Sequence, residues 1–530
     1  MKKSLSLCLI LILIVSQLCA CSNTTENSQS SANPPEGSSQ PVQDNLKTTM
    51  KIVRAADSDS MDPILMNYNE SIWLCDLLYD TLLSPSDDGS ENLKNMCDDY
   101  SISEDGKTWT FNLKKGLCFS DGSEIKAQDW LDTFTRLKNS KESIWNSPVV
   151  PVVSLSAPDD YTLVIELEAA RAAFAAEIGL FSMSVQSKAH HEEYIAKGGD
   201  PAAYMPLSTG PYVVKEWVRS EYVKLEKNPY YADKDKISIE EITFMVVPDD
   251  NARVTMLQAG EADVVLDLPY SMLDALKQTQ GVTVKAFDGA ISRYIIFNTL
   301  DEKLSDIKVR KALRSATDQE QLIKMVTYGY AVPAASYLPP GDLYRIDIAA
   351  DPYDIEKAKA LLAEAGYPDG LELDMWVRAG NSEYEQIATI LKEQWAKAGV
   401  KLNLTTMETA ALVERQEEMQ HTMVIGRWTE DINDPIQLSD YFWNYPVTQG
   451  YYTGWNDQEL QALSLASQTE LDTAKRAEMY KQLQEARYEY CAELSLYHPQ
   501  YAVAISDHVQ NFVLTPLGKY RLENTTILAD

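Results

Sequence analysis

Histidine and cysteine are scarce in this sequence, and none of them forms a recognisable metal or redox motif. The five histidines and seven cysteines include no C-x-x-C pair and no Cys/His spacing typical of a zinc site. A G-x-S-x-G elbow, an H-E-x-x-H helix and a glycine-rich phosphate loop are also missing. We therefore expect no metal, no cofactor and no enzyme, with an exported hydrolase as the alternative.

Positive charge is also scarce. The chain has 47 Lys and Arg against 79 Asp and Glu, a formal net charge of −32. Such a surface repels nucleic acid and anionic lipid and lacks the basic stripe that a polyanion binder needs. The composition therefore predicts no nucleic-acid partner.

Four cysteines lie far apart in the region after residue 21. Sequence alone cannot pair them, and one or two disulfides would fit an extracellular protein. We expect instead that they are buried, reduced and act as small apolar side chains. They are Cys75, Cys97, Cys118 and Cys491.

Long apolar runs are confined to the start of the chain. After Lys2 and Lys3, the run from Leu5 to Val15 has the length of a signal-peptide core and falls short of the ~20 residues of a membrane span. Leu18-Cys19-Ala20-Cys21 then resembles a bacterial lipobox. We predict a signal peptide over 1–20 and lipid attachment at Cys21, with plain secretion and a free Cys21 as the alternative.

The segment 21–48 is rich in Ser, Asn, Gln, Thr and Pro and contains no aromatic residue. Such a segment cannot bury enough apolar surface to offset the entropy lost on ordering. We interpret it as a flexible tether that holds the protein on the extracytoplasmic face of the cell membrane.

Strand and helix patterns are interspersed through the rest of the chain, which predicts a mixed α/β fold. Alternating apolar and polar residues predict strands at Lys107–Leu113, Tyr161–Leu167, Tyr212–Trp217 and Tyr222–Glu226. Helical spacing and capping residues predict helices after Asp306 and at Ile355–Ala365, Glu385–Ala398 and Asp472–Glu493.

Short motifs follow one another in a fixed order along the chain. They are Met61-Asp62-Pro63 with Leu77–Leu83, Glu104–Leu113, Ser208–Tyr212, Lys227–Tyr231, Gly260–Asp263, Phe297–Thr299, Asp306–Leu313 and Trp428–Pro435. In this order they resemble the extracellular solute-binding proteins of oligopeptide and dipeptide ABC importers, solute-binding protein family 5. The resemblance covers nearly the whole chain after the tether.

The resemblance implies an α/β, bilobed periplasmic-binding-protein-like fold with a hinge and an extra subdomain on the first lobe. Lobe I would comprise 49–80, 206–297 and 496–530, the extra subdomain 81–205, and lobe II 298–495. It further implies a monomer that captures a peptide in the cleft and delivers it to the ABC permease. A nickel chelate, haem, glutathione or a sugar is the alternative cargo.

The resemblance also assigns residues to the ends of a peptide ligand. Asp431 stands where family members place the acidic partner of the ligand's α-amino group, and a turn cap is the alternative role. Arg378 lies in the segment that supplies an arginine to the ligand carboxylate, and an exposed strand-end arginine is the alternative.

Five further residues are candidates for the cleft wall, with core packing or a surface turn as the alternative for each. They are Trp428, Tyr68, Asn67, Arg293 and Tyr294. The dense aromatic stretch Tyr441–Trp455 is expected to pack the second lobe or to line side-chain pockets.

Overall fold

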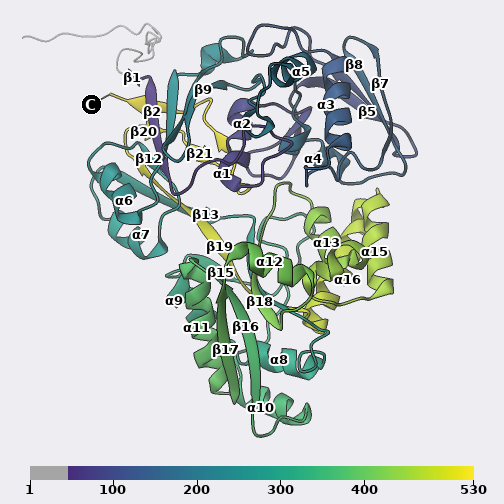
Figure 1. Cartoon of the computed structure of the whole chain (residues 1–530), viewed down its shortest axis with the longest axis vertical. Helices are drawn as coiled ribbons and strands as arrows, with labels where there is room; N and C mark the ends of the chain where they lie inside the picture. Colours follow the sequence, from purple (N-terminus) through teal and green to yellow (C-terminus); the bar gives the residue numbers. More distant parts are fainter. Residues whose placement is uncertain (1–45, 530) are drawn as a thin grey trace, which may run out of the picture. The chain divides into compact units, whose positions relative to one another are not determined.

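One twelve-stranded sheet runs through the structure, and its longest strand, β19 (Glu493–Ser506), serves both of its parts. The first part of β19 pairs with β14 (Ile291–Phe297) and β15 (Ala331–Pro333). The second part pairs with β13 (Val282–Asp288) and β12 (Val264–Val265). Figure 1 shows β13 and β19 passing between the upper and the lower elements, so the chain crosses at least twice.

The computed structural model describes residues 46–529. The other strands of the large sheet are β2 (Thr49–Arg54), β9 (Tyr212–Val218), β10 (Tyr222–Lys227), β11 (Glu241–Val246), β16 (Leu371–Arg378), β17 (Val400–Met407) and β18 (Met423–Thr429). A separate four-stranded sheet contains β5 (Cys97–Ile102), β6 (Thr108–Leu113), β7 (Val152–Asp159) and β8 (Thr162–Leu167). Short pairs and a small sheet contain β1 (Leu46–Lys47), β3 (Leu83–Pro85), β4 (Asn92–Lys94), β20 (Val509–Gln510), β21 (Val513–Leu514), β22 (Tyr520–Arg521) and β23 (Thr526–Leu528).

Helices are interspersed among these strands, as the sequence predicts. In the first part of the chain they are α1 (Asn69–Ile72), α2 (Cys75–Leu78), α3 (Ala127–Asn139), α4 (Phe174–Glu177), α5 (Lys188–Ala196), α6 (Asp250–Gln258) and α7 (Tyr270–Leu276). Those that follow are α8 (Ile307–Ser315), α9 (Gln319–Val326), α10 (Ile355–Glu364), α11 (Ser382–Ala396), α12 (Thr409–Glu417), α13 (Ile436–Trp443), α14 (Tyr445–Tyr452), α15 (Gln458–Thr469) and α16 (Thr473–Tyr490).

The predicted strands are confirmed as β6, β8, β9 and β10. In β6 the alternation buries Trp109, Phe111 and Leu113 on one face, as expected for a half-buried strand. The predicted helices are confirmed as α8, α10, α11 and α16, although α11 begins at Ser382 because the side chain of Asn381 caps it.

Helix α16 buries charged residues beside its predicted apolar face. The apolar pattern predicts that Met479, Leu483, Ala486 and Tyr490 turn inward; Leu483 is buried, the other three are half-buried, and Ala486 and Tyr490 pack against the same core as Leu483. Arg476 and Arg487 are buried on this helix as well. Each is paired with a carboxylate from another element, so a charged face can turn into the protein.

The apolar cores fall into two sets that follow the two parts of the large sheet. One set includes β2, β11 and the four-stranded sheet, and the other includes β14, β16 and β18. Ile432 and Ile436, which follow β18, nevertheless pack into the first set. Because β14 packs with the second set, the chain passes from the first set to the second near Gly289, between β13 and β14. The predicted boundaries of the lobes stay a prediction.

The four cysteines are unpaired, which confirms the expectation of reduced thiols, although Cys118 is only half-buried. The predicted signal peptide and lipid site at Cys21 lie outside the described residues. Leu46 and Lys47, at the end of the predicted tether, form β1 because they pair with β23. Among residues 46–529, no helix is long and apolar enough to span a membrane.

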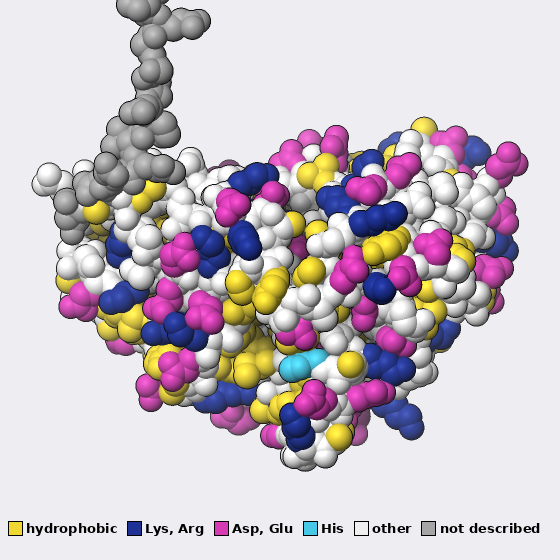
Figure 2. Space-filling view, turned by 90° about the horizontal axis from the view of Figure 1, so that it is seen from above, with side chains coloured by type: hydrophobic (Ala, Val, Ile, Leu, Met, Phe, Trp, Pro, Cys, Tyr) yellow, Lys and Arg dark blue, Asp and Glu magenta, His cyan; other side chains and the backbone are white. Residues whose placement is uncertain are grey.

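Charge is distributed over the surface without a continuous basic region on the face shown in Figure 2. There, Lys and Arg side chains lie among Asp and Glu, with apolar side chains between them. This face offers no track for a nucleic-acid backbone, in agreement with the composition.

Candidate functional site

The best candidate ligand residues lie at one edge of the large sheet. Strands β16 and β18 run parallel and pair with each other, so their carboxyl ends point to the same edge. β16 ends at Arg378, and β18 ends at Thr429, two residues before Asp431. Ligands of open α/β sheets bind outside the carboxyl ends of the strands.

Side-chain alternation places Arg378 and Trp428 on the same face of this sheet. Val424 of β18 packs in one core and its neighbour Ile425 in another, so alternate residues face opposite ways. Trp428 lies on the face of Val424. Arg378 follows Val377, which packs with Ile425, and so points to the side of Trp428.

The carboxyl of Asp431 is buried and poorly paired. The residue is 9% exposed, and its Oδ2 accepts a single hydrogen bond, from Gln437 Nε2 at 3.3 Å. Burial raises the pKa of Asp431 to about 6, against the opposing effects of Lys519 and of the Gln437 bond. A buried carboxylate with so little support gains strongly from a ligand cation.

We expect affinity for a peptide to depend on pH through this carboxyl. Asp431 ionises as pH rises through about 6, whereas a free α-amino group loses its proton near pH ~8. The ion pair therefore exists only between these values, and affinity should fall on both sides of that range. Titration calorimetry from pH 5 to 9 measures this dependence of affinity on pH. In Asp431→Asn the loss of affinity at acid pH should disappear.

Arg378 offers the opposite charge at the same edge. Its side chain is half-buried, and its Nε is buried without a hydrogen-bond partner among the described residues. A guanidinium left in this state can bind a carboxylate through two parallel hydrogen bonds. Asp431 is thus a poorly paired anion and Arg378 a cation without a partner for Nε, and together they suit a zwitterion.

Two residues of the C-terminal segment lie near Asp431 and were not predicted from sequence. Lys519 is buried and forms an ion pair with Asp76 at 3.5 Å. Tyr501 is 9% exposed, and its buried hydroxyl has no partner among the described residues. Burial and the charge of Asp431 both raise the pKa of Tyr501, so this hydroxyl stays protonated as a donor.

Aromatic side chains pack around Trp428 at this edge of the sheet. The ring of Trp428 lies 4.9 Å from that of Tyr441 and 6.0 Å from that of Tyr451. Tyr294 is 1% exposed and meets Tyr451 edge-on at 6.4 Å. The stretch after Tyr441 thus packs the protein, while Trp428 itself stays half-buried at the edge.

Gly426 is required for this packing. A Cβ built at Gly426 would lie 2.4 Å from Cε2 of the Tyr294 ring, closer than carbon atoms approach in proteins. We expect Gly426→Ala to lower the free energy of unfolding by about 1–3 kcal/mol through overpacking. Urea denaturation measures this loss, which should shrink in a Tyr294→Leu background where the ring is gone.

The remaining predicted residues lie elsewhere or are already engaged. Arg293 forms a two-bond ion pair with Glu383, at 3.0 and 3.1 Å, and Glu383 also accepts a bond from Tyr497. Tyr68 is 60% exposed at the start of α1. The exposed Asn67 donates a hydrogen bond to the carbonyl of Leu65. Their roles as ligand contacts stay predictions.

A group of buried acids beside Asp431 was also missed. Glu430 is 0% exposed, and neither of its carboxyl oxygens has a hydrogen-bond partner among residues 46–529. Burial and the charge of Asp342 raise its pKa, the nearby Trp428 side chain lowers it, and the charges of Asp431 and Asp434 raise it further. Asp434 is itself paired with Arg476. The run Glu430-Asp431 signalled this group, but Asp342 is distant in sequence.

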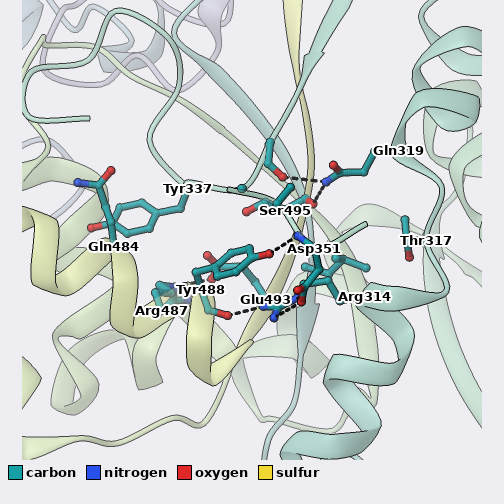
Figure 3. Close-up of a pocket in the computed structure, with 14 residues that line it drawn as sticks. Arg314, Thr317, Gln319, Tyr337, Asp351, Gln484, Arg487, Tyr488, Glu493 and Ser495 are labelled. Atoms are coloured by element: carbon teal, nitrogen blue, oxygen red, sulfur yellow. Dashed lines mark hydrogen bonds and ion pairs between the residues drawn. The ribbon is translucent and has the colours of Figure 1, made fainter. Parts of the chain in front are cut away.

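Two cavities differ in what they can hold. The cavity in Figure 3 lies beside α16 and β19. Arg314, Asp351 and Arg487 are among the residues that line it. Its volume of about 20 Å³ is that of a single water molecule. A second cavity, of about 160 Å³, lies beside the candidate site, between Asn433, Asp342, Leu517 and Asp88. Within the described residues, no group of His, Cys, Asp and Glu is placed to hold a metal ion.

The comparisons with known proteins agree with this geometry. The profile of the bacterial extracellular solute-binding proteins, family 5, matches residues 94–449. The dipeptide-binding protein of Escherichia coli K12 is 28% identical over 85% of this chain and 89% of its own. Heme-binding protein A of Haemophilus influenzae is 30% identical, over 80% and 82% respectively.

A solved structure extends the likeness to the fold. The dipeptide-binding protein of Pseudoalteromonas sp. SM9913, in complex with Met-Leu, is 25% identical with a TM-score of 0.79. The match covers 90% of this chain and 99% of that one. The expected periplasmic-binding-protein-like fold is confirmed, and the relatives are named as binding proteins.

Proposed function

We propose that this chain, which belongs to the bacterial extracellular solute-binding proteins of family 5, captures short peptides for an ABC importer. Membership makes it a substrate-binding component for peptides or related cargo. The observation that favours peptides is the presence of both charges where β16 and β18 end: among residues 46–529, Asp431 has no ion pair and Arg378 has no partner for Nε.

The two groups would bind the two ends of one cargo molecule. The ligand ammonium would pair with Asp431 and contact the buried groups around it. The ligand carboxylate would bind Arg378. Between these two ends, the peptide backbone would pair with the protein as in β-strand addition, which does not depend on the side chains of the peptide. The two lobes would close over the cargo about the crossings near Gly289 and in β19.

The predicted lipid site at Cys21 supports a location on the outer face of the cell membrane. A tethered monomer there can capture cargo and hand it unchanged to a permease. Haem is a second candidate cargo, because the relative at 30% identity is named a heme-binding protein. A buried carboxyl after β18 and an arginine at the end of β16 favour a zwitterion over haem.

Native mass spectrometry with a mixed peptide pool tests the proposal. We expect intact peptides bound one to one, together with a rise in melting temperature. Peptide fragments would indicate a hydrolase, and a Soret band after incubation with haem would indicate the other cargo. Either result in the absence of bound peptides contradicts the proposal.

The role of Arg378 has its own test. We expect Arg378→Gln to weaken binding of a peptide with a free carboxyl terminus about tenfold, since the guanidinium is partly screened by solvent. The same peptide with an amidated terminus should bind the wild type and the variant alike. An equal loss for both peptides would assign Arg378 to folding of the edge rather than to the carboxylate.

A further inference from the structure

The cavity of about 160 Å³ beside the candidate site has only acidic residues among its charged lining. Asp88, Asp288 and Asp342 line it, and no Lys, Arg or His does. Its uncharged walls come from Ala290, Asn433 and Leu517 among others. An apolar cavity of similar volume holds a guest of the size of benzene, so this one can take the end of a long side chain.

Asp342 at the base of this cavity is buried and unsatisfied. The residue is 9% exposed, and its Oδ2 has no hydrogen-bond partner among residues 46–529. The nearest cation, Arg345, forms an ion pair with Asp347 at 2.8 Å and donates to the carbonyl of Leu338. Burial and the charge of Asp434 raise the pKa of Asp342, against the weaker effect of Arg345.

The rim of the cavity keeps its negative charge. Asp88 accepts hydrogen bonds from Ser86 and Ser90, which lower its pKa to about 2. Asp288 accepts a bond from Gln500 Nε2 at 2.9 Å and is exposed. A cation entering here would pass two carboxylates before it reached Asp342.

The same segments build this cavity and the surroundings of Asp431. Asn433, in the cavity wall, follows Asp431 by only two residues, so their Cα atoms lie at most about 7 Å apart. The amide of Glu430 donates to the carbonyl of Ala290, whose own amide donates to Pro516. Ala290 and Pro516 both line the cavity. A ligand whose ammonium is at Asp431 therefore has a side chain within reach of Asp342.

We propose that this cavity binds a positively charged side chain of the cargo, an alkylammonium or a guanidinium, with Asp342 as its partner. The preferred cargo is then a peptide with a basic residue at or next to its free amino terminus. This inference rests on the proposed peptide-binding function. On binding, the ammonium or guanidinium group donates hydrogen bonds to the carboxylate of Asp342 and pairs with its charge.

Matched tripeptides test the inference by titration calorimetry at pH 7.5. Lys-Ala-Ala and Ala-Lys-Ala are compared with the same peptides acetylated at Nε, which keep the side-chain length and lose the charge. In the wild type, we expect the charged form to bind at least about tenfold tighter at one of the two positions.

Asp342→Asn should reduce the ratio between charged and acetylated peptides towards one. Asp98→Asn, an exposed aspartate on β5 far from the cavity lining, should leave the ratio unchanged. Should Asp342→Asn fail to fold, the exposed Asp288→Asn is expected to reduce the same ratio by a smaller factor.

The outcomes separate this inference from the proposed function. Equal binding of charged and acetylated peptides by the wild type overturns the cationic subsite and leaves peptide capture intact. An unchanged ratio in Asp342→Asn overturns the role of Asp342. If none of the tripeptides binds, both the proposed function and this inference are contradicted.

Discussion

Asp431→Asn should weaken the binding of a short peptide with a free amino terminus by about 30- to 5,000-fold. The carboxyl is 9% exposed and holds a single hydrogen bond at 3.3 Å, so the ligand ammonium would be its main partner. Truncating one member of a buried charge pair costs about 2–5 kcal/mol, because the other charge is left buried and alone. Asparagine keeps the shape of the side chain and its contact with Gln437, so the substitution removes only the charge.

N-acetylated peptides provide the matched control for this experiment. Acetylation removes the ammonium and should reduce wild-type affinity by a similar factor, whereas Asp431→Asn should bind both forms about equally. The double cycle isolates the pair because each change removes the same contact. Wild-type protein that binds free and acetylated peptides equally well would show that the ammonium is held elsewhere.

Local patterns predicted the elements of the fold well, and they failed where charge is buried. Strand β6 could be predicted because alternation and burial coincide at Trp109, Phe111 and Leu113. On helix α16 the apolar Leu483 is buried as its pattern predicts, but the burial of Arg476 and Arg487 could not be predicted. A hydrophobic pattern treats such residues as exposed, and only the distant partners Asp434 and Glu493 make their burial favourable.

The candidate site shows the same division. The order of motifs predicts Asp431 and Arg378 as ligand residues, and they lie just after β18 and at the end of β16. Nothing in the local sequence of Asp342 and Lys519 indicates that they are buried. Tyr294 is packed in the core and Arg293 is engaged in an ion pair, so their ligand roles stay predictions.

Arg476 is expected to be the most important single ion-pair residue for the stability of this region. Its guanidinium binds both carboxylate oxygens of Asp434, at 2.6 and 2.8 Å, and donates to the carbonyl of Ser467. Both side chains are about 95% buried, with 4% and 5% exposed. Arg476→Met should lower the free energy of unfolding by about 3–5 kcal/mol, because it leaves a buried carboxylate next to Asp342 and Glu430.

Two controls distinguish lost charge pairing from lost packing in that experiment. Lys481→Met on the exposed side of α16 should change stability by less than about 0.5 kcal/mol, because its ion pair with Glu478 is exposed. Asp434→Asn in the Arg476→Met background should recover much of the loss, since it removes the stranded charge and keeps a cap for the amide of Ile436. A double variant as unstable as Arg476→Met alone would mean that packing of the arginine stem, rather than neutralisation of Asp434, holds α16 against the candidate site.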